Sequence, residues 1–160
     1  MRRNLWVAVA LAAAVVVSPM LASASPVDDG TLTLTYINQP VNETGIDIND
    51  DQNLTPGDGS VSNAVLLKQG DVVGQVVNAC QYITVRKDGM GGVLQCLSTI
   101  KLAGGQITAQ GRIVLVEGQT NEVQAAITGG TGDFAEAGGY VESVAIPGTM
   151  NTRVTLYIIF

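Results

Sequence analysis

Histidine is absent from this chain of 160 residues. A serine or cysteine nucleophile needs a neighbouring general base, and in hydrolytic triads that base is histidine. The absence therefore argues against a triad hydrolase. Any acid–base chemistry in this protein has to use carboxylates, tyrosines or arginines.

Basic residues are scarce, with 8 lysines and arginines against 14 aspartates and glutamates and a net charge of -6. None occurs between Arg3 and Lys68, whereas seven acidic residues lie from Asp28 to Asp58. Phosphate-binding surfaces need clustered positive charge, which this chain lacks. Nucleic acids and anionic lipid surfaces are therefore not expected partners.

Long apolar runs are missing except at the N-terminus. Arg2 and Arg3 precede an apolar run from Leu5 to Val17, which is shorter than the roughly 20 residues of a membrane-spanning helix. The small residues Ala22-Ser23-Ala24 then form a cleavage pattern. We interpret residues 1–24 as a secretory signal peptide and residues 25–160 as one domain that is secreted and does not contact the membrane after cleavage.

Cysteine is nearly absent as well, and both examples, Cys80 and Cys96, lie in the exported part. An oxidising compartment favours a disulfide between them, which in the entropic model stabilises the fold by about 3 kcal/mol. A reactive thiol or a metal ligand is the alternative.

Strand patterns fill the remaining sequence, and no segment after residue 24 shows helical periodicity. Within 106–116, for example, Ile107, Ala109 and Ile113 alternate with polar residues and should face the interior. The expected strands are 31–38, 60–68, 72–85, 93–102, 106–116, 122–128, 138–145 and 151–159. Glycine-rich turns of two or three residues separate many of them, which implies antiparallel neighbours.

The predicted fold class is therefore all-β, an eight-stranded antiparallel up-and-down β-barrel of the calycin-like kind. Eight strands enclose room for packed side chains or one small ligand. The glycine run from Ala126 to Phe134 is interpreted as a turn between two of these strands. It is not a dinucleotide-binding loop, because it lies in the last quarter of the chain and precedes no helix.

Residues 40–59 are predicted to form a long acidic loop. Its segment Asp47–Asp58 places oxygen-bearing side chains at alternating positions, as a calcium loop does. Gln52 stands where such loops have glycine, and Asp58 stands where they have glutamate. We predict a solvated loop without a metal, with calcium binding as the alternative.

Asp133 is the candidate catalytic residue, because a carboxylate near an apolar cavity is a plausible general acid. The alternative is an aspartate that hydrogen-bonds the turn backbone. Tyr36, Tyr82 and Tyr140 are candidate ligand-binding residues, although tyrosines in strands often only pack.

Two motifs carry a family resemblance, Gly104-Gly105-Gln106-Ile107-Thr108 and Ile127-Thr128-Gly129-Gly130-Thr131-Gly132. With them the chain resembles the dirigent and allene oxide cyclase barrel superfamily from about Gly57 onward. The resemblance implies a hydrophobic cavity, no cofactor, frequent assembly as a homotrimer, and a place for Asp133 in the pocket. The catalytic glutamate and proline of plant allene oxide cyclases find no secure match in the segment from Tyr36 to Glu43.

These observations give one functional hypothesis and one alternative. The hypothesis is a secreted barrel that binds a small hydrophobic molecule and steers its cyclisation or stereoselective coupling. The alternative is a non-catalytic carrier of the lipocalin type or a structural barrel.

Overall fold

A computed structural model of the protein describes residues 30–116 and 122–160. The predicted signal peptide, residues 1–24, lies outside these ranges. The strands are β1 (Thr31–Ile46), β2 (Gly59–Lys68), β3 (Asp71–Val85), β4 (Gly91–Leu102), β5 (Gly105–Val116), β6 (Val123–Gly132), β7 (Gly138–Ala145) and β8 (Thr152–Ile159).

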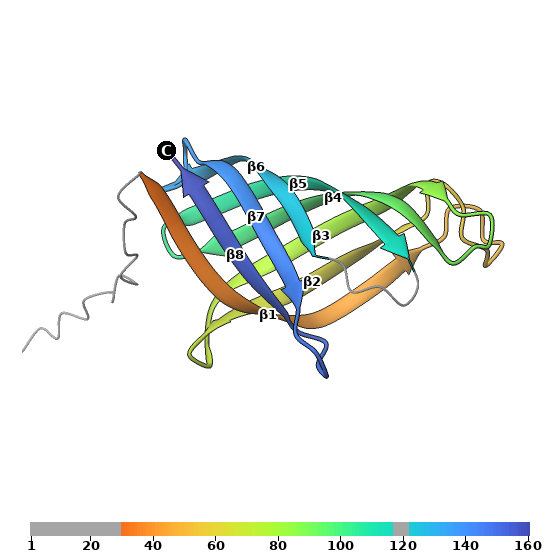
Figure 1. Ribbon diagram of the computed structural model, residues 1–160, viewed down its shortest axis with the longest axis horizontal. Coiled ribbons are helices and arrows are strands. Elements are labelled where there is room, and N and C mark those ends of the chain that lie inside the picture. The colour runs from red at the N-terminus through yellow and green to blue at the C-terminus, as the bar shows by residue number, and fades with distance from the viewer. Residues whose placement is uncertain (1–29, 117–121) are drawn as a thin grey trace, which may run out of the picture.

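The strands form one closed barrel in sequence order, with every neighbouring pair antiparallel (Figure 1). The predicted fold class is confirmed. The alternation that predicted β5 is visible in its side chains, because Ile107 and Ala109 are buried while Gln106 and Gln110 are exposed. Within the described residues there is no helix of the length and apolarity needed to cross a membrane.

One end of the barrel, here called the packed end, is filled with side chains. It carries the β2–β3, β4–β5 and β6–β7 turns together with the start of β1 and the end of β8. Leu66, Ile107, Leu156 and Ile158 are fully buried in this part of the core, and Phe134 from the β6–β7 turn joins the same cluster. The core cluster to which these residues belong takes side chains from all eight strands and from the β6–β7 turn.

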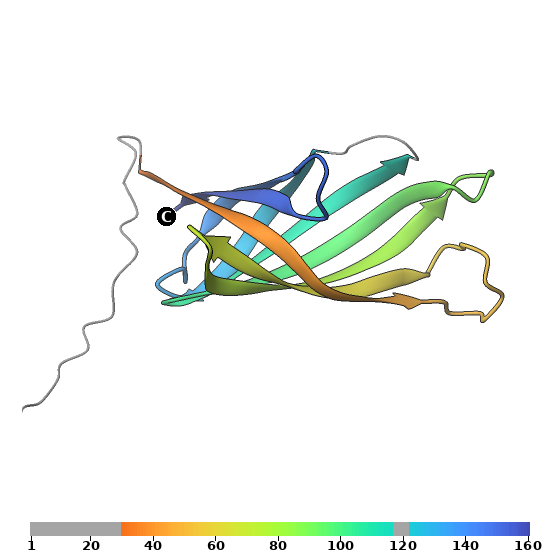
Figure 2. The ribbon, with the colours of Figure 1, turned by 90° about the horizontal axis from the view of Figure 1, so that it is seen from below.

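The other end, here called the open end, is built from strands of unequal length. β1 and β3 have 16 and 15 residues, whereas β7 and β8 have 8 each. Figures 1 and 2 show the β1–β5 side of the wall extending beyond the β7–β8 hairpin, toward the loop that joins β1 to β2. β1 pairs with β8 only from Thr31 to Asn38 and continues along β2 to Ile46.

The predicted loop at 40–59 is therefore wrong in its first part, because Pro40 to Ile46 belong to β1 and only residues 47–58 form a loop. The polar sequence of this segment hid the strand. Pro40 is tolerated because β1 no longer pairs with β8 at this position, so no ladder hydrogen bond on that side is lost.

The glycine run also differs from its prediction. Gly129, Gly130 and Gly132 lie within β6 and pair with Thr108, Ile107 and Gly105 of β5, and the turn begins only at Asp133. A Cβ on Gly130 would lie against the Phe134 carbonyl oxygen and 2.6 Å from that of Gln106. Gly130 and Gly132 thus allow backbones to approach closely in a strand, rather than forming the turn itself.

Candidate functional site

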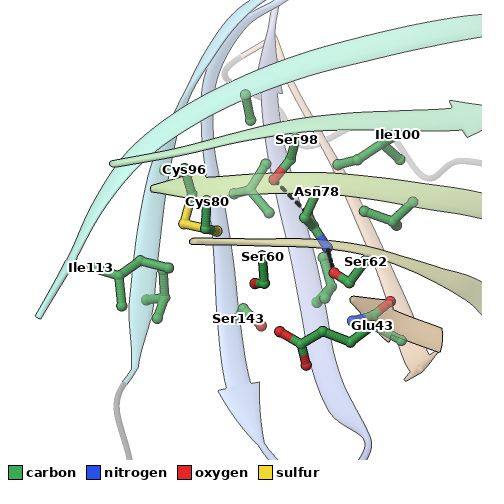
Figure 3. A pocket seen from close by; sticks show the side chains of 17 residues that line it. Glu43, Ser60, Ser62, Asn78, Cys80, Cys96, Ser98, Ile100, Ile113 and Ser143 are labelled. Carbon is green, nitrogen blue, oxygen red and sulfur yellow. Dashed lines mark hydrogen bonds between the residues drawn. A yellow bond between two sulfur atoms is a disulfide. The ribbon is translucent and has the colours of Figure 1, made fainter. Parts of the chain in front are cut away.

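The open half of the barrel encloses a cavity of about 240 Å³. For comparison, a cavity of about 150 Å³ is large enough for benzene. Its wall consists of Asn38, Glu43, Ser60, Ser62, Val76, Asn78, Cys80, Cys96, Ser98, Ile100, Ala109, Ile113, Val123, Ala125, Val141, Ser143 and Val154 (Figure 3). Every strand of the barrel contributes at least one of these residues.

The floor of the cavity is apolar because it is the upper surface of the packed core. Ala64, Val76, Ile100 and Ile107 stand directly opposite one another across β2 to β5. All four are buried, and Val76 and Ile100 also face the cavity. On the β2–β5 side, a ligand that reaches this layer meets hydrocarbon.

A polar row lies one layer nearer the open end. Ser62, Asn78 and Ser98 are again directly opposite on β2, β3 and β4. The Asn78 Nδ2 donates to Ser62 Oγ at 3.3 Å, and the Ser98 hydroxyl donates to Asn78 Oδ1 at 2.7 Å, as the dashed lines of Figure 3 show. Side chains held in this way present fixed polar groups to a ligand.

The third layer holds the disulfide. Cys80 and Cys96 are paired across β3 and β4 with their Cα atoms 4.1 Å apart, and the predicted bond between them is confirmed. Both line the cavity beside Ser60 of β2. The bond joins β3 and β4 covalently within the cavity wall.

A β-bulge in β1 determines which of its side chains enter the cavity. The pairing with β2 shifts between Pro40 and Asn42. Before the shift Asn38 is opposite the buried Leu66, and after it Glu43 is opposite Ser62. Residues five apart in a regular strand face opposite sides, so the extra residue is what brings both Asn38 and Glu43 to the inner face.

Glu43 is the only ionisable side chain among the described residues that line the cavity. Figure 3 shows it extending from β1 into the cavity, with its carboxylate on the side where Ser143 of β7 lies. It is exposed at the open end, so water reaches it. The cavity therefore combines an apolar floor, a neutral polar row and one carboxylate near its mouth.

Asp133, the predicted catalytic residue, lies at the packed end and is exposed. Its backbone N–H donates to the Gly104 carbonyl oxygen at 3.0 Å. Gly104 has a φ of 95°, and a Cβ there would collide with the Asp133 carboxylate. Asp133 is not among the residues that line the cavity, so its catalytic role stays a prediction and its position favours the turn alternative.

The three candidate tyrosines occupy three different environments, none of them in the cavity wall. Tyr36 is buried in the core, and this burial raises its pKa. Tyr82 lies at the rim of the open end, half-buried. Tyr140 is on the outer wall, where its ring stacks on Tyr157 with the ring centres 4.5 Å apart. Their ligand-binding role stays a prediction.

The loop at 47–58 is fixed to this rim through its own backbone. The backbone carbonyl oxygen of Tyr82 accepts a hydrogen bond from the Gly57 N–H at 2.8 Å. The backbone N–H of Tyr82 donates to the Asp58 carbonyl oxygen at 2.7 Å. The buried Asp58 carboxylate accepts from Ile48 N at 3.0 Å and Thr55 N at 2.6 Å, and these bonds lower its pKa.

The other acidic groups of the loop serve a similar purpose. The Asp47 carboxylate accepts hydrogen bonds from the backbone N–H groups of Asn49, Asp50 and Gln52. Within the part of the chain that the structure describes, no three acidic, cysteine or histidine residues are grouped as a metal site.

The residues of the cavity wall were missed by sequence reasoning, although signals for them existed. A proline inside an otherwise strand-like segment, such as Pro40, often marks a bulge. Ser62, Asn78 and Ser98 are polar residues at positions in phase with the buried Ala64, Val76 and Ile100, and an inward polar residue is unusual unless it faces a ligand or water.

Comparison with protein families places the chain among known barrels. Residues 40–159 match the model of the allene oxide cyclase barrel-like domain. The chain belongs to this family. Comparison with curated protein sequences found no match.

Solved structures with the same barrel include enzymes and proteins of several activities. A pyocyanin demethylase is 25% identical with a TM-score of 0.65, over 79% of this chain and 98% of its own. An exo-specific intermolecular Diels-Alderase is 14% identical with a TM-score of 0.58, over 80% and 97%. A pterocarpan synthase dirigent protein is 16% identical with a TM-score of 0.61, over 81% and 94%.

Proposed function

We propose that this member of the allene oxide cyclase barrel-like family binds a small, largely apolar molecule in the cavity of the open end and steers its cyclisation or coupling. The observation that carries the proposal is the division of the barrel into a packed half and a half with a cavity of about 240 Å³. A barrel selected only for stability gains nothing from leaving half of its interior unfilled.

The layers of the cavity suit a positioning role. The apolar floor buries the hydrocarbon part of a ligand, and the Ser62–Asn78–Ser98 row fixes the orientation of its polar part. Holding a flexible molecule in one reactive geometry lowers the entropic part of a cyclisation barrier, with no cofactor needed. The names of similar structures, a Diels-Alderase and a pterocarpan synthase dirigent protein, are consistent with such chemistry on this barrel.

Two carboxylates are candidates for proton transfer in the proposed reaction. Glu43 lines the cavity and is therefore our first candidate for the acid or base. Asp133 keeps the role that the family resemblance implies for it, as the second candidate. Replacing each by its amide in turn, Glu43→Gln and Asp133→Asn, separates them by turnover once a substrate is known.

The proposal is tested by extracting small molecules from natively purified protein and identifying them by mass spectrometry. Ser98→Phe fills the cavity, whereas Thr99→Phe adds bulk at the neighbouring, outward-facing position of the same strand. We expect a retained molecule in the wild type and in Thr99→Phe, and its loss in Ser98→Phe. Equal retention by both variants would place the ligand elsewhere and contradict the proposal.

A non-catalytic carrier is the second candidate function, and one observation favours it. Apart from Glu43, the described polar residues of the cavity wall are serines and asparagines, which recognise ligands but rarely catalyse. A carrier would release the extracted molecule unchanged, and Asp133→Asn would leave its retention intact.

Secretion and assembly belong to the same proposal. The basic and apolar N-terminus supports export, and the Cys80–Cys96 disulfide suits an oxidising compartment. The homotrimer implied by the resemblance remains a proposal. An apolar row of Val61, Ala79 and Leu97 on the outer face of β2 to β4 supports a protein contact there, because Val61 and Leu97 are 42% and 51% exposed.

A further inference from the structure

The charges around the cavity restrict what it can hold. Glu43 is the single ionisable residue in the described wall, and no lysine or arginine lines it. Arg112 and Arg153, the basic residues of β5 and β8, are exposed on the outside of the barrel. An anionic ligand would lose hydration without gaining a counter-charge and would also face the Glu43 carboxylate.

Asn38 adds an acceptor to the cavity wall. Its Nδ2 donates to Thr152 Oγ1 at 3.2 Å, and this bond holds the amide in place. Its Oδ1 is buried and accepts no hydrogen bond from the residues that the structure describes. A buried carbonyl oxygen without a donor is destabilising, and a ligand N–H group that donates to it would remove this penalty.

The bulge between Pro40 and Asn42 places these two acceptors on the same wall. Asn38 and Glu43 both come from β1, on either side of the bulge, and both line the cavity. A neutral acceptor and a carboxylate on one wall, above an apolar floor, match a ring compound with a cationic nitrogen at its edge. The volume of about 240 Å³ suits one or two rings.

We propose that the ligand is a small ring compound bearing a cationic N–H group, with Glu43 as its counter-ion and Asn38 Oδ1 as an acceptor of its N–H bond. This inference rests on the proposed function, because it names the chemical class that the same cavity takes. It excludes carboxylate-bearing lipids as preferred ligands. Glu43 and Asn38 act here as specificity residues and need not take part in a reaction.

The test uses three probes that share one ring and differ in their polar group. Protonated benzylamine, benzyl alcohol and benzoate are titrated into the purified protein, and dissociation constants are measured by NMR. Because the ion pair is exposed to water, we expect benzylammonium to bind about fivefold more tightly than benzyl alcohol, with benzoate the weakest. The advantage of benzylammonium should shrink as salt is added.

Variants assign the preference to particular residues. Glu43→Gln should remove the advantage of benzylammonium while leaving benzyl alcohol binding unchanged. Glu136→Gln removes the same charge from the exposed β6–β7 turn at the packed end and should keep the wild-type order. Asn38→Ala should weaken benzylammonium and benzyl alcohol alike, with thermal unfolding used to verify that the variant is folded.

The possible outcomes distinguish a failure of the cationic-ligand proposal from a failure of the proposed function of the cavity. Benzoate binding as tightly as benzylammonium, or an unchanged order in Glu43→Gln, would overturn the cationic ligand but leave a ligand-binding cavity. A shift of the order in Glu136→Gln equal to that in Glu43→Gln would mean that net charge, rather than the site, sets the preference. If none of the three probes binds the wild type, the proposed cavity function fails as well.

Discussion

The packed end and the open end are made by the same strands, yet they differ in what the inward positions carry. Along β5, Ile107 is fully buried in the core, whereas Ile113, three inward positions further, lines the cavity. Along β3 the inward residues change from Val76 to Asn78 and then Cys80. The two ends of the barrel therefore have different roles. One end provides stability through close packing, and the other provides a polar-lined space at a cost in packing.

The largest effect expected from this comparison is on stability. Ile107→Ala should lower the free energy of unfolding by about 2–5 kcal/mol, because it leaves a cavity in a filled core. Ile113→Ala makes the same chemical change where a cavity already exists and should cost less than about 1.5 kcal/mol. Urea unfolding of both variants measures the difference. Equal losses would mean that the open end is packed as tightly as the other.

The disulfide is expected to have the next largest effect. Replacing Cys80 and Cys96 together by serine should destabilise the protein by about 2–4 kcal/mol, because the bond restricts the unfolded chain. The comparison is made by denaturant unfolding, with reductant added to the wild type as the control. An unchanged midpoint in both experiments would show that the open end needs no covalent clamp.

Acid should release the loop at the rim before it affects the core. The hydrogen bonds from Ile48 and Thr55 hold the pKa of Asp58 below its ordinary value of 3.8. Its stabilising contribution is therefore complete above that value and is lost as the pH falls through the lower folded pKa. Asp58→Asn should be less stable than the wild type at neutral pH, and the difference should vanish in strong acid. A constant difference at all pH values would rule out the charge of Asp58 as its cause.

A substitution in the polar row is expected to have the smallest effect on stability. Its effect on ligand binding should be large. Asn78→Leu replaces a cavity residue by an apolar one of similar size, so stability should change by no more than about 1 kcal/mol. Binding of a hydrogen-bonding probe such as benzyl alcohol should weaken, which the same NMR titration measures. If stability falls as it does for Ile107→Ala, the row belongs to the core and not to the site.

Much of the fold could be predicted from local patterns. The alternation in 106–116, the turn residues and the short connections predicted eight antiparallel strands, and seven of the expected strands agree with the structure to within a few residues. The errors share one cause. At Pro40–Ile46 and Gly129–Gly132 the strands contain polar residues or glycines, and the partner that makes them strands lies elsewhere in the chain.

The candidate site was predicted less well, for a related reason. Asp133 was singled out by its motif and the tyrosines by their chemistry, but neither property says which half of the barrel a residue occupies. The inward or outward direction of a strand residue follows from its position, whereas the layer it joins follows from its partners on neighbouring strands. Ser62, Asn78 and Ser98 become a row only because β2, β3 and β4 pair in that register.

Composition and local patterns were enough to predict the all-β class, the eight strands and a disulfide between the two cysteines, and to argue against a histidine-dependent triad. The folded barrel was needed to show which half is filled and which is open. It was also needed to show that one extra residue in β1 turns Glu43 to the inner face, on the same wall as Asn38. Strand register and bulges arise from pairing between distant segments, and periodicity along one segment does not encode them.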